Sequence, residues 1–134
     1  MEPTSRPLLH RGWTFVCGGY IVLLIGISIT AYLNLLLSQL DRIPHYDTFG
    51  HFFLLGIAAY LAHRALRKRA WRIRKVSIPI GLLSIAAFVF VDEALQALSP
   101  ARTVSLSDVV ASLLGMLCFY VVGEAIDAWV RSRI

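Results

Sequence analysis

The apolar run from Val76 to Leu98 ends in Phe90-Val91-Asp92-Glu93-Ala94-Leu95-Gln96, where two adjacent carboxylates and an amide interrupt a hydrocarbon segment. By insertion scales, an ionisable side chain inside a membrane-spanning helix costs about 2.5–3.5 kcal/mol, so such residues are rare and usually functional. The run is also as long as a membrane span, which needs about 20 apolar residues. This stretch therefore predicts a membrane protein with a candidate site at the end of one span.

The composition of the whole chain agrees with this prediction. Hydrophobic residues make up 57% of the 134 residues, which exceeds the roughly 45–50% of an ordinary soluble domain. The net charge is +5, but the basic residues cluster between apolar runs instead of alternating with base-stacking aromatics, so we expect no nucleic-acid partner. Cys17 and Cys118 lie inside apolar segments without metal-binding spacing and are interpreted as core residues. We expect no cofactor and no metal.

Four apolar segments follow one another, at about residues 13–37, 46–63, 76–98 and 106–128. The first is too long for the apolar region of a signal peptide, so we expect an uncleaved span. No repeat or linker divides the chain. The sequence therefore predicts an all-α fold, a four-helix transmembrane bundle that forms one domain over residues 1–134.

Local signals mark the ends and contact faces of these helices. Pro79 is expected in the first turn of the third helix, where its missing N–H is harmless. Ser105 and Asp108 are spaced as the N-cap and N3 residues of a capping box before the fourth helix. Two small-xxx-small pairs, which let another helix approach closely, occur at Gly26/Thr30 and Ala111/Gly115. Such Gly/Ala faces are candidate contacts with other membrane proteins, besides membrane lipids.

The loop charges predict the orientation. Lys and Arg number two at the N-terminus, one in the first loop, seven in residues 64–75, one in the third loop and two at the C-terminus. Short loops rich in these residues stay cytoplasmic. We therefore expect a multi-pass protein of the cytoplasmic membrane with both termini inside.

This orientation gathers polar residues at one interface. The second and fourth spans begin outside and the third ends outside, so their polar residues lie within about two helical turns of the outer surface. The inner halves of the same spans stay apolar until Glu124 and Asp127. The candidate ligand-binding residues of this outer layer are Asp47, His51, Asp92, Glu93, Gln96, Arg102 and Asp108.

The carboxylates have two readings, a site for a headgroup or cation and a polar network that locks the helices together. Asp92 shares a helical face with Gln96, whereas the adjacent Glu93 must point elsewhere. Arg102 is the natural counter-ion or a ligand for a carboxylate or phosphate. The capping box accounts for Asp108 on structural grounds alone.

His51 also allows more than one role. With Asp47, four residues away on the same face, it has the spacing of a general base or a metal ligand. A hydrogen bond to Asp47 or Asp92 is the structural alternative. No nucleophile elbow, zinc-protease motif or phosphate loop is present. The residues alone therefore leave a binding protein, a small membrane hydrolase or transferase, and a structural subunit open.

Three segments carry a family resemblance. The segment from Asp47 to Gly56 resembles the D-K-x-x-H-F opening of VanZ-like membrane proteins. Asp92-Glu93-Ala94-Leu95-Gln96 matches their D-E-x-x-Q, and the segment from Pro100 to Asp108 resembles their P-x-R-x-x-s-x-x-D. The resemblance covers about residues 41–120. The chain departs from it at Thr48, where many relatives have Lys, and at Ser112, where Asn is common.

The resemblance implies an envelope function. The family is named for an accessory protein that raises resistance to the glycopeptide teicoplanin without altering the peptidoglycan precursor. For this chain it implies a membrane protein whose outer polar pocket binds an amphiphilic envelope precursor, a lipid headgroup or a glycopeptide-like antibiotic. A structural subunit of a larger complex and a small enzyme using His51 with a carboxylate remain the alternatives.

Overall fold

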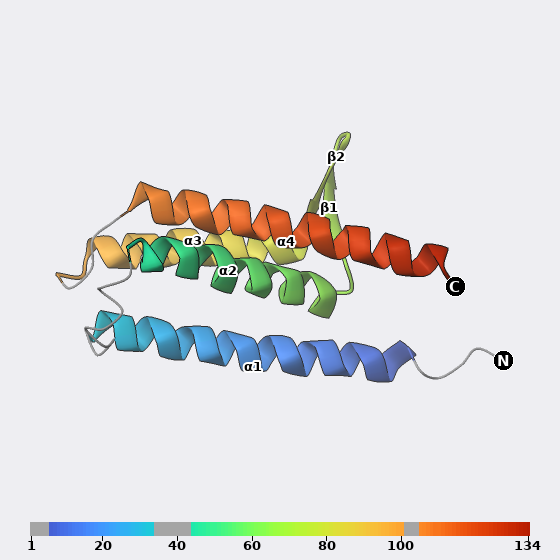
Figure 1. The fold of residues 1–134 in the computed structure, drawn as a ribbon, viewed down its shortest axis with the longest axis horizontal. Helices are drawn as coiled ribbons and strands as arrows, with labels where there is room; N and C mark the ends of the chain where they lie inside the picture. The colour runs from blue at the N-terminus through green and yellow to red at the C-terminus, as the bar shows by residue number, and fades with distance from the viewer. Residues whose placement is uncertain (1–5, 34–43, 101–104) are drawn as a thin grey trace.

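A computed structural model describes residues 6–33, 44–100 and 105–134 of the chain. Four helices account for most of them: α1 (Arg6–Tyr32), α2 (Tyr46–Ala65), α3 (Ile80–Ala97) and α4 (Leu106–Ser132). Between α2 and α3 lies a hairpin of two strands, β1 (Ala70–Ile73) and β2 (Val76–Pro79). The four helices run alternately up and down, so the start of α1, the end of α4 and the hairpin share one end of the bundle (Figure 1).

Among the described residues, α1, α3 and α4 are long and apolar enough to cross a membrane. The remaining helix, α2, packs against all three of them. Its buried face meets Leu24 of α1, Val89 of α3 and Met116 of α4 in one apolar cluster. Many large apolar side chains on the other three helices are exposed, as expected where lipid replaces protein neighbours. The predicted helical bundle is thus confirmed, with α2 as its centre.

Glycines let α2 and α4 approach closely. A Cβ on Gly115 of α4 would overlap the backbone carbonyl of Phe52 in α2, and a Cβ on Gly56 would lie 2.9 Å from the carbonyl oxygen of Gly115. The predicted Ala111/Gly115 pair therefore does serve helix packing. Within residues 6–33, 44–100 and 105–134, no neighbour gives the Gly26/Thr30 pair such a role, because a Cβ on Gly26 would meet nothing within 4 Å.

The hairpin corrects the prediction that a helix begins at about Val76. Residues Val76–Pro79 pair antiparallel with Ala70–Ile73, in the register Trp71 opposite Ile78 and Ile73 opposite Val76. Arg74 takes a left-handed conformation in the two-residue turn, with φ of 54°. The β-branched and aromatic residues of this stretch favour a strand. Pro79 consequently occupies the extended N-cap position of α3 instead of its first turn.

Smaller differences concern helix ends. The first helix begins at Arg6, earlier than the expected residue 13, while α2 and α4 each continue beyond the expected 63 and 128. The part of the first predicted span after residue 33 lies outside the described residues, as do Asp41 and Arg42 of the first loop.

The end of the bundle that carries the hairpin is held by ion pairs. Asp127 of α4 accepts hydrogen bonds from Arg64 at 2.5 Å and from Lys68 at 2.6 Å. Lys68 also lies 2.7 Å from Glu124, whose carboxylate is 3.3 Å from Nε2 of the buried His63. We call these five residues, His63, Arg64, Lys68, Glu124 and Asp127, the basic-end cluster. They join the end of α2 to the last turns of α4.

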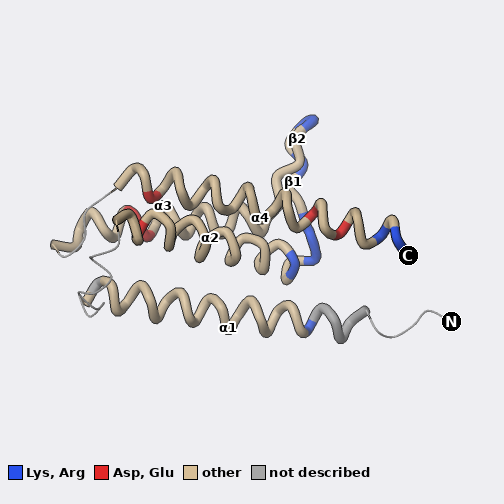
Figure 2. Tube along the Cα trace, in the orientation of Figure 1, with Lys and Arg blue, Asp and Glu red and all other residues tan. Residues whose placement is uncertain are grey.

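Charge divides the bundle along its length. Every described Lys and Arg lies toward the end with the hairpin, whereas Asp47, Asp92, Glu93 and Asp108 lie toward the opposite end (Figure 2). The antiparallel order of the helices brings these four acids to one end, because they stand at the start of α2 and α4 and toward the end of α3; the acids at the other end, Glu124 and Asp127, are paired with cations. We call this opposite end the acidic end.

Candidate functional site

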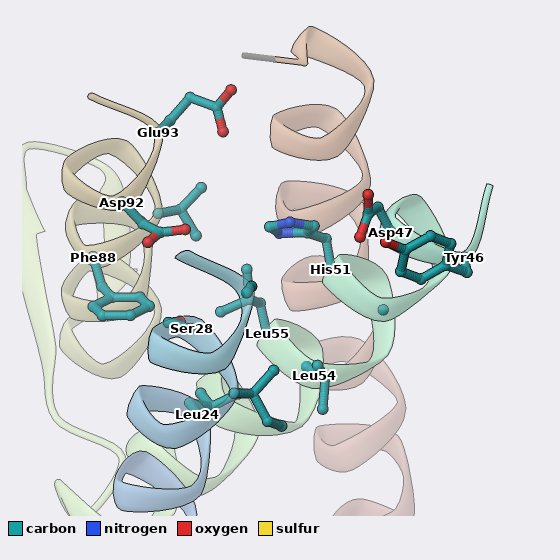
Figure 3. A pocket seen from close by; sticks show the side chains of 14 residues that line it. Leu24, Ser28, Tyr46, Asp47, His51, Leu54, Leu55, Phe88, Asp92 and Glu93 are labelled. Atoms are coloured by element: carbon teal, nitrogen blue, oxygen red, sulfur yellow. The ribbon is translucent and has the colours of Figure 1, made fainter. Parts of the chain in front are cut away.

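A cavity of about 240 Å³ opens at the acidic end between α1, α2 and α3. Its polar wall includes Asp47 and His51 from α2 and Asp92 and Glu93 from α3. Asp92 and His51 point into it from opposite sides (Figure 3). The apolar part of the wall comes from three helices, with Leu24, Ile27, Ala31, Leu54, Leu55, Phe88 and Val89, and of these Leu24 and Leu54 lie deeper in the bundle than Asp92 and His51 (Figure 3). Four of the seven residues predicted from the sequence thus line one hollow.

Asp47 and His51 both reach the cavity because they stand one turn apart near the start of α2. Asp47 is exposed and His51 half-buried. Gly50, between them, also lines the wall. The spacing seen in the sequence therefore produces a shared helical face, as predicted.

The two adjacent acids of α3 have different partners. The side-chain amide of Gln96 donates to Oδ2 of Asp92 at 2.7 Å, one turn away on the same helix. Glu93 instead accepts a hydrogen bond of 2.9 Å from the backbone N–H of Ser105, which precedes α4. Gln96 is almost completely buried, with 1% of its surface exposed, so it supports Asp92 from behind the cavity. Asp92 is thus held within α3, whereas Glu93 connects α3 to the residue before α4.

Asp108 is where the predicted capping box is wrong. Ser105 is the N-cap residue of α4, but it makes no side-chain cap hydrogen bond. Its hydroxyl pairs with that of Ser107 at 2.6 Å. The Asp108 carboxylate turns toward α2 and accepts a hydrogen bond of 2.9 Å from Thr48. Asp108 is buried, and a buried carboxylate requires such a donor. Its position in the first turn also suits the helix dipole.

Ser112 connects this group to His51. Its hydroxyl donates to the backbone carbonyl of Asp108 at 2.7 Å and lies 3.3 Å from Nδ1 of His51. A hydroxyl has one proton to donate, so toward His51 it must accept. In this arrangement Nδ1 of His51 is the donor to the Ser112 hydroxyl. The structure thus gives His51 a serine partner on α4 instead of the predicted carboxylate.

Electrostatically, the cavity wall is rich in acceptors. Asp47, Asp92 and Glu93 present carboxylates, and His51 adds its imidazole ring. No Lys or Arg side chain lines the described part of the cavity. Within residues 6–33, 44–100 and 105–134, no group of three His, Cys, Asp or Glu side chains is placed to hold a metal ion. The wall is therefore suited to a group that donates hydrogen bonds or carries positive charge.

The structure separates the predicted site residues into three groups. Asp47, His51, Asp92 and Glu93 line the cavity, and Gln96 and Asp108 lie behind it. Arg102 lies outside the described residues. The roles of Thr48 and Ser112 were not predicted from the sequence, although both residues depart from the VanZ-like pattern. Both contact Asp108, so the two departures are neighbours in space.

The contribution of α1 was also missed. Leu24, Ile27, Ser28 and Ala31 form one wall of the cavity. These positions are spaced three or four apart and so share one helical face. In a helix that is apolar on all sides, nothing distinguishes that face from the lipid-facing one.

The chain was compared with known proteins at three levels. No family model, no curated protein and no solved structure matches it.

Proposed function

We propose that the chain is a VanZ-like integral membrane protein of the bacterial cytoplasmic membrane whose acidic end faces outward. Three helices long and apolar enough to span support the membrane location. The gathering of the described cations at the other end supports the orientation, because positively charged ends stay cytoplasmic. Both termini and the hairpin would then be inside.

Labelling of single cysteines tests this orientation. The variants would carry Cys at exposed Ser107 or Ser132, in a background with Cys17 and Cys118 replaced by Ala. In intact cells, a membrane-impermeant maleimide should label the Ser107 variant and spare the Ser132 variant until the cells are opened. The reverse labelling pattern contradicts the proposal.

At the acidic end, we propose that the cavity binds the headgroup of an amphiphile, such as a lipid-linked envelope precursor or a lipopeptide-like antibiotic. The observation that carries the proposal is the division of the cavity wall. Polar side chains lie toward the end of the bundle and apolar ones, such as Leu24 and Phe88, lie deeper. An amphiphile has the same division between headgroup and chain.

The acceptors of the cavity wall limit the kinds of headgroup that could bind there. The carboxylates of Asp92 and Glu93 would accept hydrogen bonds from an ammonium group and neutralise its charge. A phosphate would be repelled by these carboxylates; the residue that the sequence predicts for a phosphate is Arg102, which lies outside the described residues. The headgroup that fits the described wall is therefore a primary amine or a cluster of sugar hydroxyls, and the VanZ resemblance directs attention to those of the envelope.

Lipid retention tests the proposal directly. The protein is purified in mild detergent and its bound lipids are identified by mass spectrometry. Ser28→Phe would fill the cavity, whereas Ile29→Phe on the lipid-facing side of α1 is a matched control, since Ile29 is 51% exposed and does not line the cavity. We expect Ser28→Phe to lose the retained amino-lipid at least tenfold relative to Ile29→Phe. Equal lipid retention in both variants refutes cavity binding.

Two other functions come from the sequence. For the hydrolase or transferase, the hydroxyl beside His51 is that of Ser112, which is fully buried and already donates to a backbone carbonyl, so it is poorly placed to act as a nucleophile. The structural-subunit function has one supporting observation. Gly18, Gly19 and Gly26 on α1 have no described neighbour that a Cβ would touch. A monomer in mild detergent, measured by light scattering, would count against it.

A further inference from the structure

The hairpin between α2 and α3 has two chemically different faces. Residues directly opposite in an antiparallel pair point to the same side of the sheet, and successive residues alternate. The register places Trp71 with Ile78 and Ile73 with Val76 on one face. The other face carries Arg72 with Ser77 and Ala70 with Pro79. One face is therefore wholly apolar, and the other is polar and basic.

The apolar face is largely uncovered by the protein. Trp71 is 59% exposed, Ile73 49% and Val76 60%. A two-stranded hairpin on its own is at best marginally stable in water. A persistent hairpin with an exposed apolar face therefore requires a surface to cover it.

The charges of the hairpin region are mostly uncompensated. Of the seven cations in residues 64–75, Arg64 and Lys68 pair with acids of α4. The other five form no ion pair within the described ranges, and none of them is buried. They are Arg67, Arg69, Arg72, Arg74 and Lys75. The covering surface should therefore be anionic.

The hairpin also lies where a membrane surface would be. It leaves the bundle between the last turn of α2 and the first turn of α3 and projects crosswise to the helix axes (Figure 1). Helices that span a membrane stand roughly along its normal, so a crosswise element at their ends runs along the surface. The hairpin root is fixed at this level by the contacts of Arg64 and Lys68 with Asp127.

We propose that this hairpin is an interfacial anchor that lies on the anionic lipid headgroups around the bundle. Trp71, Ile73 and Val76 enter the boundary between headgroups and acyl chains, where tryptophan is enriched in membrane proteins. Arg72, Arg74 and Lys75 contact the lipid phosphates. Each cation near such a surface contributes about 1 kcal/mol, or about fivefold in affinity. The inference rests on the membrane location proposed above and is independent of the ligand of the cavity.

Tryptophan fluorescence in vesicles tests the anchor. Trp13→Phe/Trp129→Phe leaves Trp71 as the single tryptophan in the full chain. The protein is reconstituted into phosphatidylcholine vesicles with and without phosphatidylglycerol. Brominated acyl chains should quench Trp71, more strongly when phosphatidylglycerol is present, and aqueous acrylamide should quench it weakly. Strong acrylamide quenching with no quenching by brominated lipid, in both compositions, overturns the proposal.

Matched charge variants separate the hairpin from general basicity. Arg72→Ala/Arg74→Ala removes two hairpin cations, and Arg131→Ala/Arg133→Ala removes two from the end of α4. In vesicles with phosphatidylglycerol, the hairpin pair should shift the ratio of lipid-buried to water-exposed Trp71 toward water about fivefold per cation, and the α4 pair should leave it unchanged. An identical response of the two pairs overturns the role of the hairpin charges.

The same samples distinguish failure of the anchor from failure of the membrane location. After alkaline carbonate extraction, a spanning protein stays with the vesicles. A chain that stays with them while Trp71 is exposed to water refutes the anchor alone. A chain that is extracted refutes the membrane location and the anchor together.

Discussion

The carboxylates at the two ends of the bundle have different kinds of partner. In the basic-end cluster, the carboxylates of Glu124 and Asp127 pair directly with Arg64 and Lys68, and no charge in this group of four lacks a partner of opposite sign. At the acidic end, Asp108 and Glu93 are held by a hydroxyl and a backbone N–H. Neutral donors hold a carboxylate in position and leave its charge uncancelled. The basic end therefore joins helices through ion pairs, whereas the hydrogen bonds described at the acidic end hold carboxylates beside or behind a cavity.

Aromatic residues strengthen the same contrast. At the basic end, the guanidinium of Arg64 lies 5.1 Å from the centre of the Trp13 ring and 5.4 Å from that of Tyr60. These cation–π contacts bring α1 to α2 at the point where α2 also pairs with α4. At the other end, the space between α1 and α2 is part of the cavity. The helices α1 and α2 are thus in contact at the basic end and are separated by part of the cavity at the acidic end.

The largest predicted effect comes from the close contact of α2 and α4 on which both ends depend. Gly115→Ala would place a Cβ against the carbonyl of Phe52, the residue after His51. Backbone atoms cannot move aside as a flexible side chain does, so we expect a loss of about 3 kcal/mol in the free energy of unfolding. Gly26→Ala is the control, because its Cβ would meet nothing within 4 Å. Thermal unfolding in mild detergent measures both.

If the contact is as rigid as described, Gly115→Ala should also reduce lipid retention by the cavity, since it displaces α2 near His51. Equal stability of the two glycine variants would show that α2 and α4 separate easily. The close contact between these helices would then not be what positions the residues of both ends.

A smaller effect is expected when one acid is neutralised at each end. Asp127→Asn removes the charge that Arg64 and Lys68 share, and the Asp127 side chain is only 17% exposed. Between the 3–5 kcal/mol of a fully buried pair and the less than 1 kcal/mol of a surface pair, we expect a loss of about 2 kcal/mol. Asp47→Asn at the exposed cavity rim should change stability by less than about 0.5 kcal/mol.

When lipid binding is measured instead of stability, Asp47→Asn should have the larger effect and Asp127→Asn the smaller. Asp47→Asn should weaken retention of an amino-lipid, while Asp127→Asn, at the far end, should leave retention per folded molecule unchanged. Mass spectrometry of the purified variants provides this second measurement. A large stability loss in Asp47→Asn would show that an acid of the acidic end also stabilises the fold, and the two ends would then not differ in this respect.

Hydrogen bonds to a neutral donor should matter less again. Thr48→Val keeps the shape of the side chain but removes the donor to Asp108. We expect a loss of about 1 kcal/mol in the free energy of unfolding, since a buried carboxylate is left with one donor fewer. Thr30→Val is the matched control, because the Thr30 hydroxyl is exposed and donates to the Ile27 carbonyl within α1. The same unfolding assay should separate the two, and a Thr48→Val variant as stable as Thr30→Val would show that water replaces the donor.

The sequence predicts the helices better than it predicts their contacts. Long apolar segments identify four helices, and the spacing of Asp47 with His51 and of Asp92 with Gln96 places these pairs on common faces. The hairpin escaped prediction because its strands have only four residues each, too few for alternation to stand out, and its arginines already had an explanation as a topology signal.

The partners within the site depend on distances along the chain that no local pattern records. Thr48 and Asp108 are 60 positions apart, and Ser112 and His51 are 61 apart. A local motif accounted for Asp108 as a capping residue, so nothing in the sequence directed attention to α2. The burial of Asp108 against α2, a tertiary contact, decides between the two roles.

The smallest predicted effect is a pH dependence at the basic end. Burial alone would lower the pKa of Lys68, but hydrogen bonds to Asp127 and Glu124 outweigh it and raise the pKa above that of an ordinary lysine. A raised pKa in the folded state contributes stability that is complete below the unfolded pKa, near 10.4, and is lost as the pH rises through the folded value. Lys68→Arg keeps its charge throughout this range. Between pH 9 and strongly alkaline solution, wild type should therefore lose about 0.5 kcal/mol more than Lys68→Arg in the unfolding assay, since Lys68 is partly exposed to solvent. Tyrosine ionisation affects both proteins and cancels in the difference. Identical pH profiles would mean that the Lys68 ammonium contributes no net stability. The ion pair that stabilises this end would then be that of Arg64 with Asp127.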